Sequence, residues 1–257
     1  MQFFVARKRP RGLSVFSNDF ASSQFYLALR FELYAFDWRI CAVVGSMSES
    51  VQKTNYLISP LWAFLLWASL IVGVVFIAVA GVPYLIPGSD SISGFAGREP
   101  WIIAHIVAGS IALILGPFQI WLGTTRKAMA YHRTLGYGYL VSILISSSAA
   151  FYLAVTTKNG WMFGMGLFGL GVAWVLSTGL AFAAVLKHEF DQHQEWMIRS
   201  YVVTLGFVFF RVFLVASSVL EIGMIEERLV VASWICWAFP LLATEGVIQG
   251  RKIFGKA

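Results

Sequence analysis

The chain has 257 residues, of which 58% are hydrophobic and only 12% are charged, and its formal net charge is +6. Charged residues make up about a quarter of a typical soluble domain, so this composition excludes an ordinary water-soluble protein. In so apolar a chain the positive charge indicates membrane topology, and no nucleic-acid partner is expected. Cys41 and Cys236 lie far apart without metal-ligand spacing, so no disulfide framework is expected either.

Residues 1–57 form a basic N-terminal extension that differs from the rest of the chain. It begins with the basic run Arg7-Lys8-Arg9-Pro10-Arg11 and continues into a mixed aromatic and charged stretch, Phe25–Val44. No apolar core followed by a small-residue cleavage site is present, so no signal peptide is expected. Two interpretations remain open. The extension is interfacial or partly disordered, with an amphipathic helix at Phe25–Val44, or it precedes a natural start at Met47.

Residues 58–250 contain six stretches that are long enough to cross a bilayer, which takes about 20 apolar residues. They are Ile58–Leu85, Trp101–Leu122, Thr134–Val155, Trp161–Leu186, Met197–Leu220 and Leu229–Gly250. We therefore predict an all-α fold, a polytopic bundle of six transmembrane helices embedded in lipid. A basic tail, 251–257, follows the last helix.

The distribution of lysine and arginine predicts the orientation of this bundle. With six spans, both termini share a side with the loops after the second and fourth stretches, and most lysines and arginines fall there. The opposite side holds only Arg98, Lys158 and Arg228. The positive-inside rule then places both termini in the cytoplasm, and the bacterial inner membrane is the expected location.

The fourth stretch contains a glycine motif, Gly164-Met165-Gly166-Leu167-Phe168-Gly169. It matches the dinucleotide fingerprint G-x-G-x-x-G, which has meaning only between a strand and a helix. Because the motif lies inside an apolar span, we interpret its glycines as small residues that let membrane helices pack closely.

The histidines mark the edges of the apolar stretches. His132 precedes the third stretch and His193 precedes the fifth, so both are expected on the cytoplasmic side, where facing helices can bring them together. Two histidines at one membrane depth are the ligand set of a b-type haem, whose propionates Arg133 and Arg199 would pair with. His188 is expected to be a bystander.

Other interpretations of these residues and of Glu245 stay open. His132 and His193 could hold zinc together with Glu245, or each histidine only hydrogen-bonds loop carbonyls and lipid headgroups. Glu245 itself pairs with Arg199 or Arg133, or it faces water at the interface.

His105 and Arg211 are expected nearer the outer side. His105 has no second outer histidine. If it binds a haem iron, the second axial ligand would be Met162 or Met165, or the iron would be five-coordinate. Alternatively, His105 pairs with an outer acid or tunes the environment of Arg211. Arg211 lies within the fifth stretch, where a guanidinium costs about 2.5–3.5 kcal/mol on insertion scales. It is expected to meet an anion, a cofactor carboxylate or a buried acid, or else to snorkel outward.

Several separated motifs resemble, in order, a bacterial domain-of-unknown-function family of predicted multi-span membrane proteins. They are Trp101–His105 with Gly109, Gly116-Pro117-Phe118-Gln119, His132-Arg133 with Gly136 and Tyr139, His193 with Trp196-Met197 and Arg199-Ser200, and Arg211. The resemblance covers roughly Leu61–Arg251. It implies Trp, Asn and Glu in the last span, where Trp237 and Glu245 fit but Pro240 replaces the Asn. It implies no activity, but it groups these candidate residues as one set.

Four functions remain open. The first is a b-type cytochrome that carries electrons between a quinol or another membrane donor and an acceptor. The second is a non-catalytic accessory subunit of a membrane complex. The third is a proton-coupled transporter that uses His105, Arg211 and Glu245. A membrane hydrolase with a metal site is less supported, because no convincing nucleophile is present, and whether the protein is an enzyme stays open.

Overall fold

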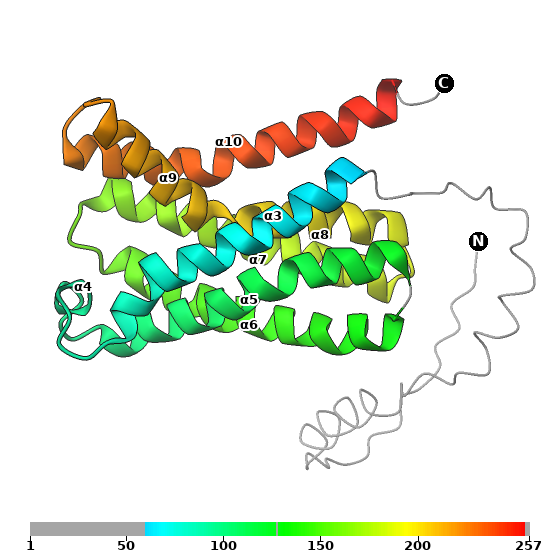
Figure 1. The fold of residues 1–257 in the computed structure, drawn as a ribbon, viewed down its shortest axis with the longest axis horizontal. Helices are drawn as coiled ribbons and strands as arrows, with labels where there is room; N and C mark the ends of the chain where they lie inside the picture. Colours follow the sequence, from blue (N-terminus) through cyan, green and yellow to red (C-terminus); the bar gives the residue numbers. More distant parts are fainter. Residues whose placement is uncertain (1–59, 127, 255–257) are drawn as a thin grey trace, which may run out of the picture. The chain divides into compact units, whose positions relative to one another are not determined.

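The computed structural model describes residues 60–126 and 128–254, which belong to one compact unit, and the predicted extension 1–57 lies outside them. Every regular element in these residues is a helix (Figure 1), which confirms the all-α prediction. The elements are α3 (Pro60–Phe76), η1 (Ile77–Gly81), η2 (Val82–Leu85), α4 (Asp90–Ser93), α5 (Glu99–Thr125), α6 (Met129–Val155), α7 (Trp161–Leu186), α8 (Phe190–Thr204), α9 (Gly206–Val219) and α10 (Ile225–Phe254).

Six of the described helical segments are long and apolar enough to cross a membrane, as predicted. The first joins α3, η1 and η2, and the fifth joins α8 and α9, which meet at Leu205. Pro83 lacks a backbone N–H, and the chain there is a short 3₁₀ turn that closes the first span. By contrast, α10 continues through Pro240 without interruption.

The spans alternate in direction, so that α3 starts and α10 finishes at the same end of the bundle (Figure 1). We call this the basic end; its described cations include Arg126, Arg133, Lys187, Arg251 and Lys252. The other end, with Asp90, Glu99, Glu221, Glu226 and Glu227, is the acidic end. The positive-inside rule still predicts that the basic end faces the cytoplasm.

Helices α5 to α8 form the centre of the bundle. Each packs on the next along the chain, α3 packs on α5, and α10 packs on α7, α8 and α9. In the most apolar window of each span, 11% of residues are buried in the first and 17% in the last, against 33–39% in the other four. The first and last spans are therefore peripheral and present most of their surface to lipid.

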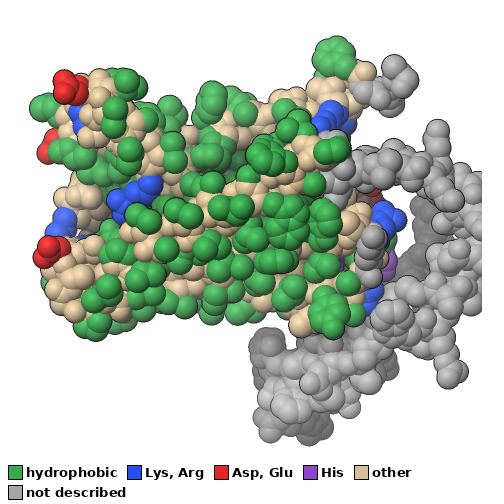
Figure 2. Space-filling view, viewed as in Figure 1, with side chains coloured by type: hydrophobic (Ala, Val, Ile, Leu, Met, Phe, Trp, Pro, Cys, Tyr) green, Lys and Arg blue, Asp and Glu red, His purple; other side chains and the backbone are tan. Residues whose placement is uncertain are grey.

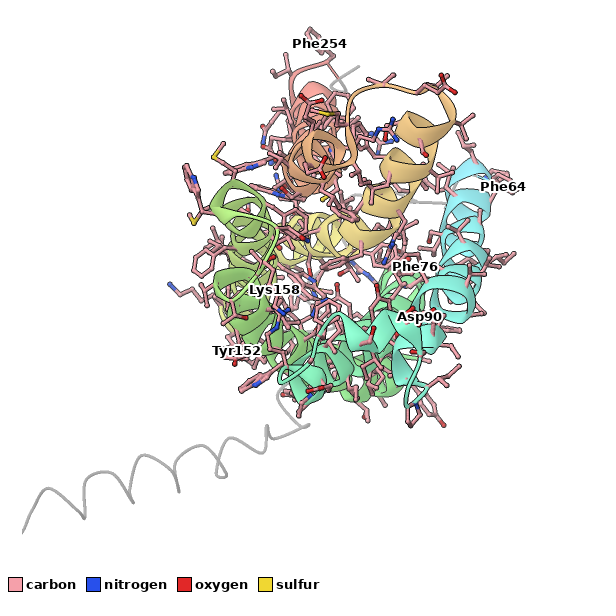
Figure 3. The ribbon with its side chains drawn as sticks, turned by 90° about the vertical axis from the view of Figure 1, so that its left-hand side faces the viewer. Phe64, Phe76, Asp90, Tyr152, Lys158 and Phe254 are labelled. Carbon is pink, nitrogen blue, oxygen red and sulfur yellow. The ribbon has the colours of Figure 1, made fainter. Side chains whose placement is uncertain are left out.

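The outer surface of the bundle is apolar, as a lipid-facing surface must be. In the face shown in Figure 2, hydrophobic side chains cover most of the helices and charged side chains lie mainly toward the two ends. Seen from the acidic end, Phe64 on α3 points away from the other helices (Figure 3), and its side chain is 68% exposed. Aromatic and aliphatic residues thus contact lipid as well as the core.

The glycines of the fourth span lie at helix–helix contacts, in agreement with the packing interpretation. A Cβ on Gly169 would stand 3.0 Å from the Trp237 ring of α10, and one on Gly171 would stand 2.7 Å from the Phe151 ring of α6. The backbone carbonyl of Gly166 accepts a hydrogen bond from the Trp237 indole at 3.1 Å. Glycine therefore lets α7 approach both neighbours closely.

Hydroxyl groups connect α6, α7 and α8 inside the core. The hydroxyl of Tyr139, a fully buried residue, lies 3.0 Å from both Ser200 Oγ and Thr204 Oγ1. Thr204 also accepts from the Trp174 indole at 2.9 Å, and Thr178 lies 2.7 Å from Ser200. Such bonds hold membrane helices together because no water is present to replace them.

Replacing Tyr139 with phenylalanine is expected to lower the free energy of unfolding by about 1 kcal/mol, because two buried hydroxyls lose a partner. Thermal unfolding of the detergent-solubilised protein measures the change. Tyr137→Phe is the matched control, since Tyr137 lies on the same helix but is 62% exposed. Equal melting temperatures for the two variants would contradict a stabilising role of the network.

Candidate functional site

His132 and His193 lie beside each other at the basic end. Each is the fourth residue of its helix, α6 for His132 and α8 for His193. Their ring centroids are 6.3 Å apart and the ring planes are nearly perpendicular, at 88°. His193 precedes the apolar stretch Met197–Leu220, but α8 begins before it, at Phe190, and this helix sets the direction of the ring.

The hydrogen bonds of the two rings differ. Nδ1 of His193 lies 2.8 Å from the carbonyl oxygen of Ala181 on α7. Only a protonated nitrogen can bond to a carbonyl, so Nδ1 carries the hydrogen and the lone pair of neutral His193 is on Nε2. Nδ1 of His132 is buried and has no hydrogen-bond partner among the described residues.

A pocket of about 300 Å³ lies against both imidazoles, between the end of α5 and the first turns of α6 and α8. Gln119 lines it, is 2% exposed, and has an amide nitrogen without a partner in the described part of the chain. Gly123 also lines it, and a Cβ there would stand 3.1 Å from Cε1 of His132. Glycine at this position therefore leaves room beside the ring.

The sequence did not indicate Arg126 as a residue of this site, and it indicated Met197 only as part of a motif. Arg126 follows α5 in a left-handed conformation, with φ at 53°, and lines the pocket together with Met197. Gln119 was noticed only as part of a motif. No spacing rule could have joined these residues, because Gln119 and Arg126 come from α5 and its C-terminal end whereas Met197 comes from α8, and they meet only through the packing of the two helices.

Arg199 is buried, 6% exposed, and is paired within the chain. Its Nε donates to Glu245 Oε2 at 2.8 Å, and its Nη2 lies 2.5 Å from the same oxygen. Nη1 is 3.6 Å from Glu195, which also binds Lys252, and the guanidinium lies over the Trp196 ring. Of the alternatives for Glu245, the structure thus shows the pairing with Arg199. An external carboxylate would have to compete with these two acids.

Zinc ligation by three side chains is not supported by this arrangement. Glu245 is engaged with Arg199, and no group of three or more His, Cys, Asp or Glu side chains gathers as a metal site in the described residues. His188 lies in the turn before α8 with φ at 61°, and its ring packs on Phe190. The pair His132 and His193 is therefore the grouping that the fold assembles.

His105 lies inside the bundle, away from this pair. It is 9% exposed, and its Nδ1 lies 3.0 Å from both the carbonyl oxygen and the hydroxyl of Ser146 on α6. The Phe207 ring packs against it with centroids 4.9 Å apart. Met162 and Met165, considered above as axial partners, are 44% and 47% exposed on the outside of α7.

Arg211 lies on the exposed side of α9, and its Nη2 donates to the hydroxyl of Tyr84 at 3.1 Å. It is therefore in a different place from both His105, which is buried against Ser146, and Glu245, which binds Arg199. The polar path that a transporter would need from these three residues is not assembled by direct contacts in the described part of the chain.

Comparison with known proteins identifies the family. Residues 102–248 match the family described as Predicted membrane protein (DUF2306). The chain belongs to this family. The DUF2306 region contains every candidate residue named above and leaves out the peripheral first span, Pro60–Leu85. Neither the curated proteins nor the solved structures gave a match to the chain.

Proposed function

We propose that this DUF2306 membrane protein holds a b-type haem between His132 and His193 and transfers electrons within the membrane. The observation that carries the proposal is the distance between the two rings, 6.3 Å from centroid to centroid. An iron held in line between two imidazole nitrogens, at about 2 Å from each, would place the centroids about 6 Å apart. Haem bound in this way supplies a one-electron redox couple.

The hydrogen bond of His193 supports the same assignment. Metal-ligating histidines usually donate their other ring N–H to a carbonyl or carboxylate, which sets the tautomer and holds the ring. Nδ1 of His193 donates to Ala181 in this way and leaves Nε2 for a metal. His132 would be held by the close packing of its ring against Gly123.

The pocket fits part of a haem. Its volume of about 300 Å³ is at the lower end for organic ligands, so part of the macrocycle would lie outside it, at the helix ends or among lipid chains. Within the chain, we assign Arg126 and the amide of Gln119 to the propionates, because both line the pocket while Arg199 is held by Glu245. Arg133 is exposed and follows His132 directly in the sequence, so we assign it to the negative charge of the propionates as well.

The basic end, which we place in the cytoplasm, would then be the side at which electrons enter or leave. A membrane quinol is the donor class that suits a site buried at the edge of the bilayer. Met197, Ile198 and Phe190 supply apolar contacts beside the pair, next to the polar side chains of the pocket, and such surroundings would tune the potential of a bound haem.

An optical spectrum tests the proposal. Full-length protein purified from haem-replete cells is expected to show the bands of a six-coordinate low-spin haem in the reduced-minus-oxidised difference, with about one haem per chain. Quinol added to the oxidised protein is expected to produce the reduced bands. Colourless protein that also fails to take up added haemin would overturn the proposal and would favour an accessory subunit.

A further inference from the structure

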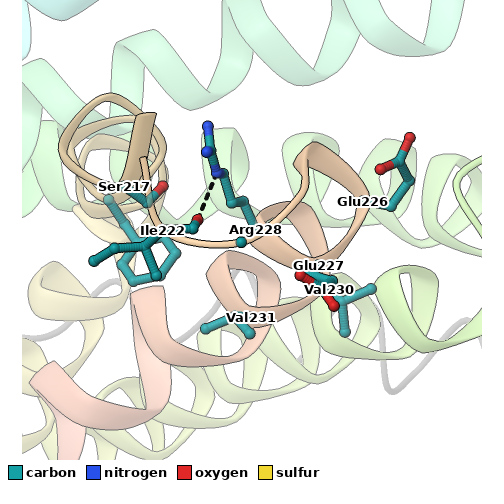
Figure 4. A pocket seen from close by; sticks show the side chains of 9 residues that line it. Ser217, Ile222, Glu226, Glu227, Arg228, Val230 and Val231 are labelled. Atoms are coloured by element: carbon teal, nitrogen blue, oxygen red, sulfur yellow. Dashed lines mark hydrogen bonds between the residues drawn. The ribbon is translucent and has the colours of Figure 1, made fainter. Parts of the chain in front are cut away.

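A second pocket, of about 640 Å³, lies at the acidic end between α9 and α10 (Figure 4). Its walls are apolar, with Phe213 from α9, Ile222 from the connecting turn, and Val230 and Val231 from α10. These elements are joined only by a short turn, so the pocket is a local feature of the α9–α10 hairpin. It shares no residue with the histidine pocket.

Charged side chains of both signs border these apolar walls. Arg228 donates from Nε to the carbonyl oxygen of Ile222 at 2.7 Å, and this hydrogen bond holds the arginine side chain across the turn (Figure 4). Its two terminal nitrogens donate no hydrogen bond within residues 60–126 and 128–254. Glu227 accepts from the backbone N–H of Met224 at 2.9 Å, whereas the Glu226 carboxylate has no partner among the described residues.

The pocket lies where a span meets the membrane surface. Helix α9 ends at Val219 and α10 begins at Ile225, each at the limit of a membrane-spanning segment. Leu220 and Ile222, in the turn between them, are 67% and 60% exposed. Apolar walls beside a charged border at this depth match the two parts of a phospholipid, its acyl chains and its headgroup.

We propose that this pocket binds a phospholipid whose headgroup carries both a phosphate and a primary ammonium, as phosphatidylethanolamine does. The acyl chain lies against Phe213, Val230 and Val231. The free terminal nitrogens of Arg228 bind the phosphate, and Glu226 accepts from the ammonium.

The balance of charge selects this headgroup class. Two carboxylates and one guanidinium border the pocket, so a purely anionic headgroup meets net repulsion. A choline headgroup has no N–H to donate to Glu226. An ethanolamine headgroup offers a phosphate that accepts from Arg228 and an ammonium that donates to Glu226.

Native mass spectrometry of the full chain tests the proposal. The detergent-solubilised protein is offered equal amounts of phosphatidylethanolamine, phosphatidylcholine and phosphatidylglycerol with identical acyl chains. Retention of the ethanolamine lipid is expected to exceed that of the other two and to fall about tenfold in Arg228→Gln. Glu226→Gln is expected to reduce the preference for ethanolamine over glycerol headgroups, and Arg228→Lys to restore most of the retention.

Lys158→Gln is the matched control, because it removes an exposed positive charge at the same end of the bundle, outside the pocket. It is expected to retain lipid as the wild type does. Val230→Trp fills the pocket without changing its charge and is expected to reduce retention of the bound lipid. Equal retention of the three lipids by the wild type, or equal losses in Arg228→Gln and Lys158→Gln, would overturn the proposal. Neither result depends on haem.

Discussion

Replacing His193 with alanine is expected to abolish the reduced-minus-oxidised haem bands, and replacing His132 is expected to do the same. In the proposed site each ring would supply one nitrogen to the haem iron, and the two ring centroids lie 6.3 Å apart beside the pocket. Loss of either ring would leave a single histidine, which is too few to hold the haem in the proposed site. The haem-to-protein ratio of the purified variants and their difference spectra measure the effect.

His188→Ala is the control for this experiment. His188 precedes His193 by five residues and lies at the same end of the bundle, but its ring packs on Phe190 in the turn before α8. The variant is expected to keep wild-type bands. Unchanged spectra in both His132→Ala and His193→Ala would exclude the pair as haem ligands, even if the wild type contains haem.

Replacing Gly166 with leucine is expected to lower the free energy of unfolding by about 3 kcal/mol or more, which is a larger loss than we expect for Tyr139→Phe. A Cβ at this position would overlap the Ser233 side chain and stand 3.0 Å from its backbone carbonyl carbon, so α10 itself would have to move. The movement would also break the hydrogen bond from Trp237 to the Gly166 carbonyl. Thermal unfolding of the monodisperse detergent-solubilised protein, followed by the yield of folded material, measures the loss.

Gly179→Leu provides the matched comparison on the same helix. No atom lies within 4 Å of a Cβ built on Gly179, so the added side chain extends into lipid. This variant is expected to melt at or above the wild-type temperature, because leucine favours the helix over glycine. If the Gly166→Leu and Gly179→Leu proteins had the same melting temperature, the α7–α10 contact at Gly166 would not be close.

The helices themselves were predictable, but their ends were not. The stretch Trp161–Leu186 agrees with α7, whereas α6 begins at Met129, five residues before the apolar stretch Thr134–Val155. Hydropathy detects only the residues in contact with hydrocarbon. Backbone hydrogen bonding continues into the polar boundary, and this is why His132 and His193 lie on helices and not in loops.

The partners of the polar residues were harder to predict than the helices. Glu245 had two candidate arginines, and the structure selects Arg199, since α8 and α10 pack together at the basic end. Arg211 was expected either to meet an anion, a cofactor carboxylate or a buried acid, or to snorkel outward, and in the structure it donates to the Tyr84 hydroxyl from the exposed side of α9. A partner more than 100 positions away cannot be read from local spacing.

The sequence by itself determined that this chain is a six-span membrane protein, because the free energy of burying about 20 apolar residues in hydrocarbon depends on composition and length alone. It also identified the two histidines as residues of one membrane depth. Only the tertiary structure decided that their rings lie 6.3 Å apart beside a shared pocket, and that Gln119 and Arg126 belong to it. The rotation of each helix about its axis decides which side chains meet, and that rotation is set by close contacts between helices, such as Gly166 against Ser233.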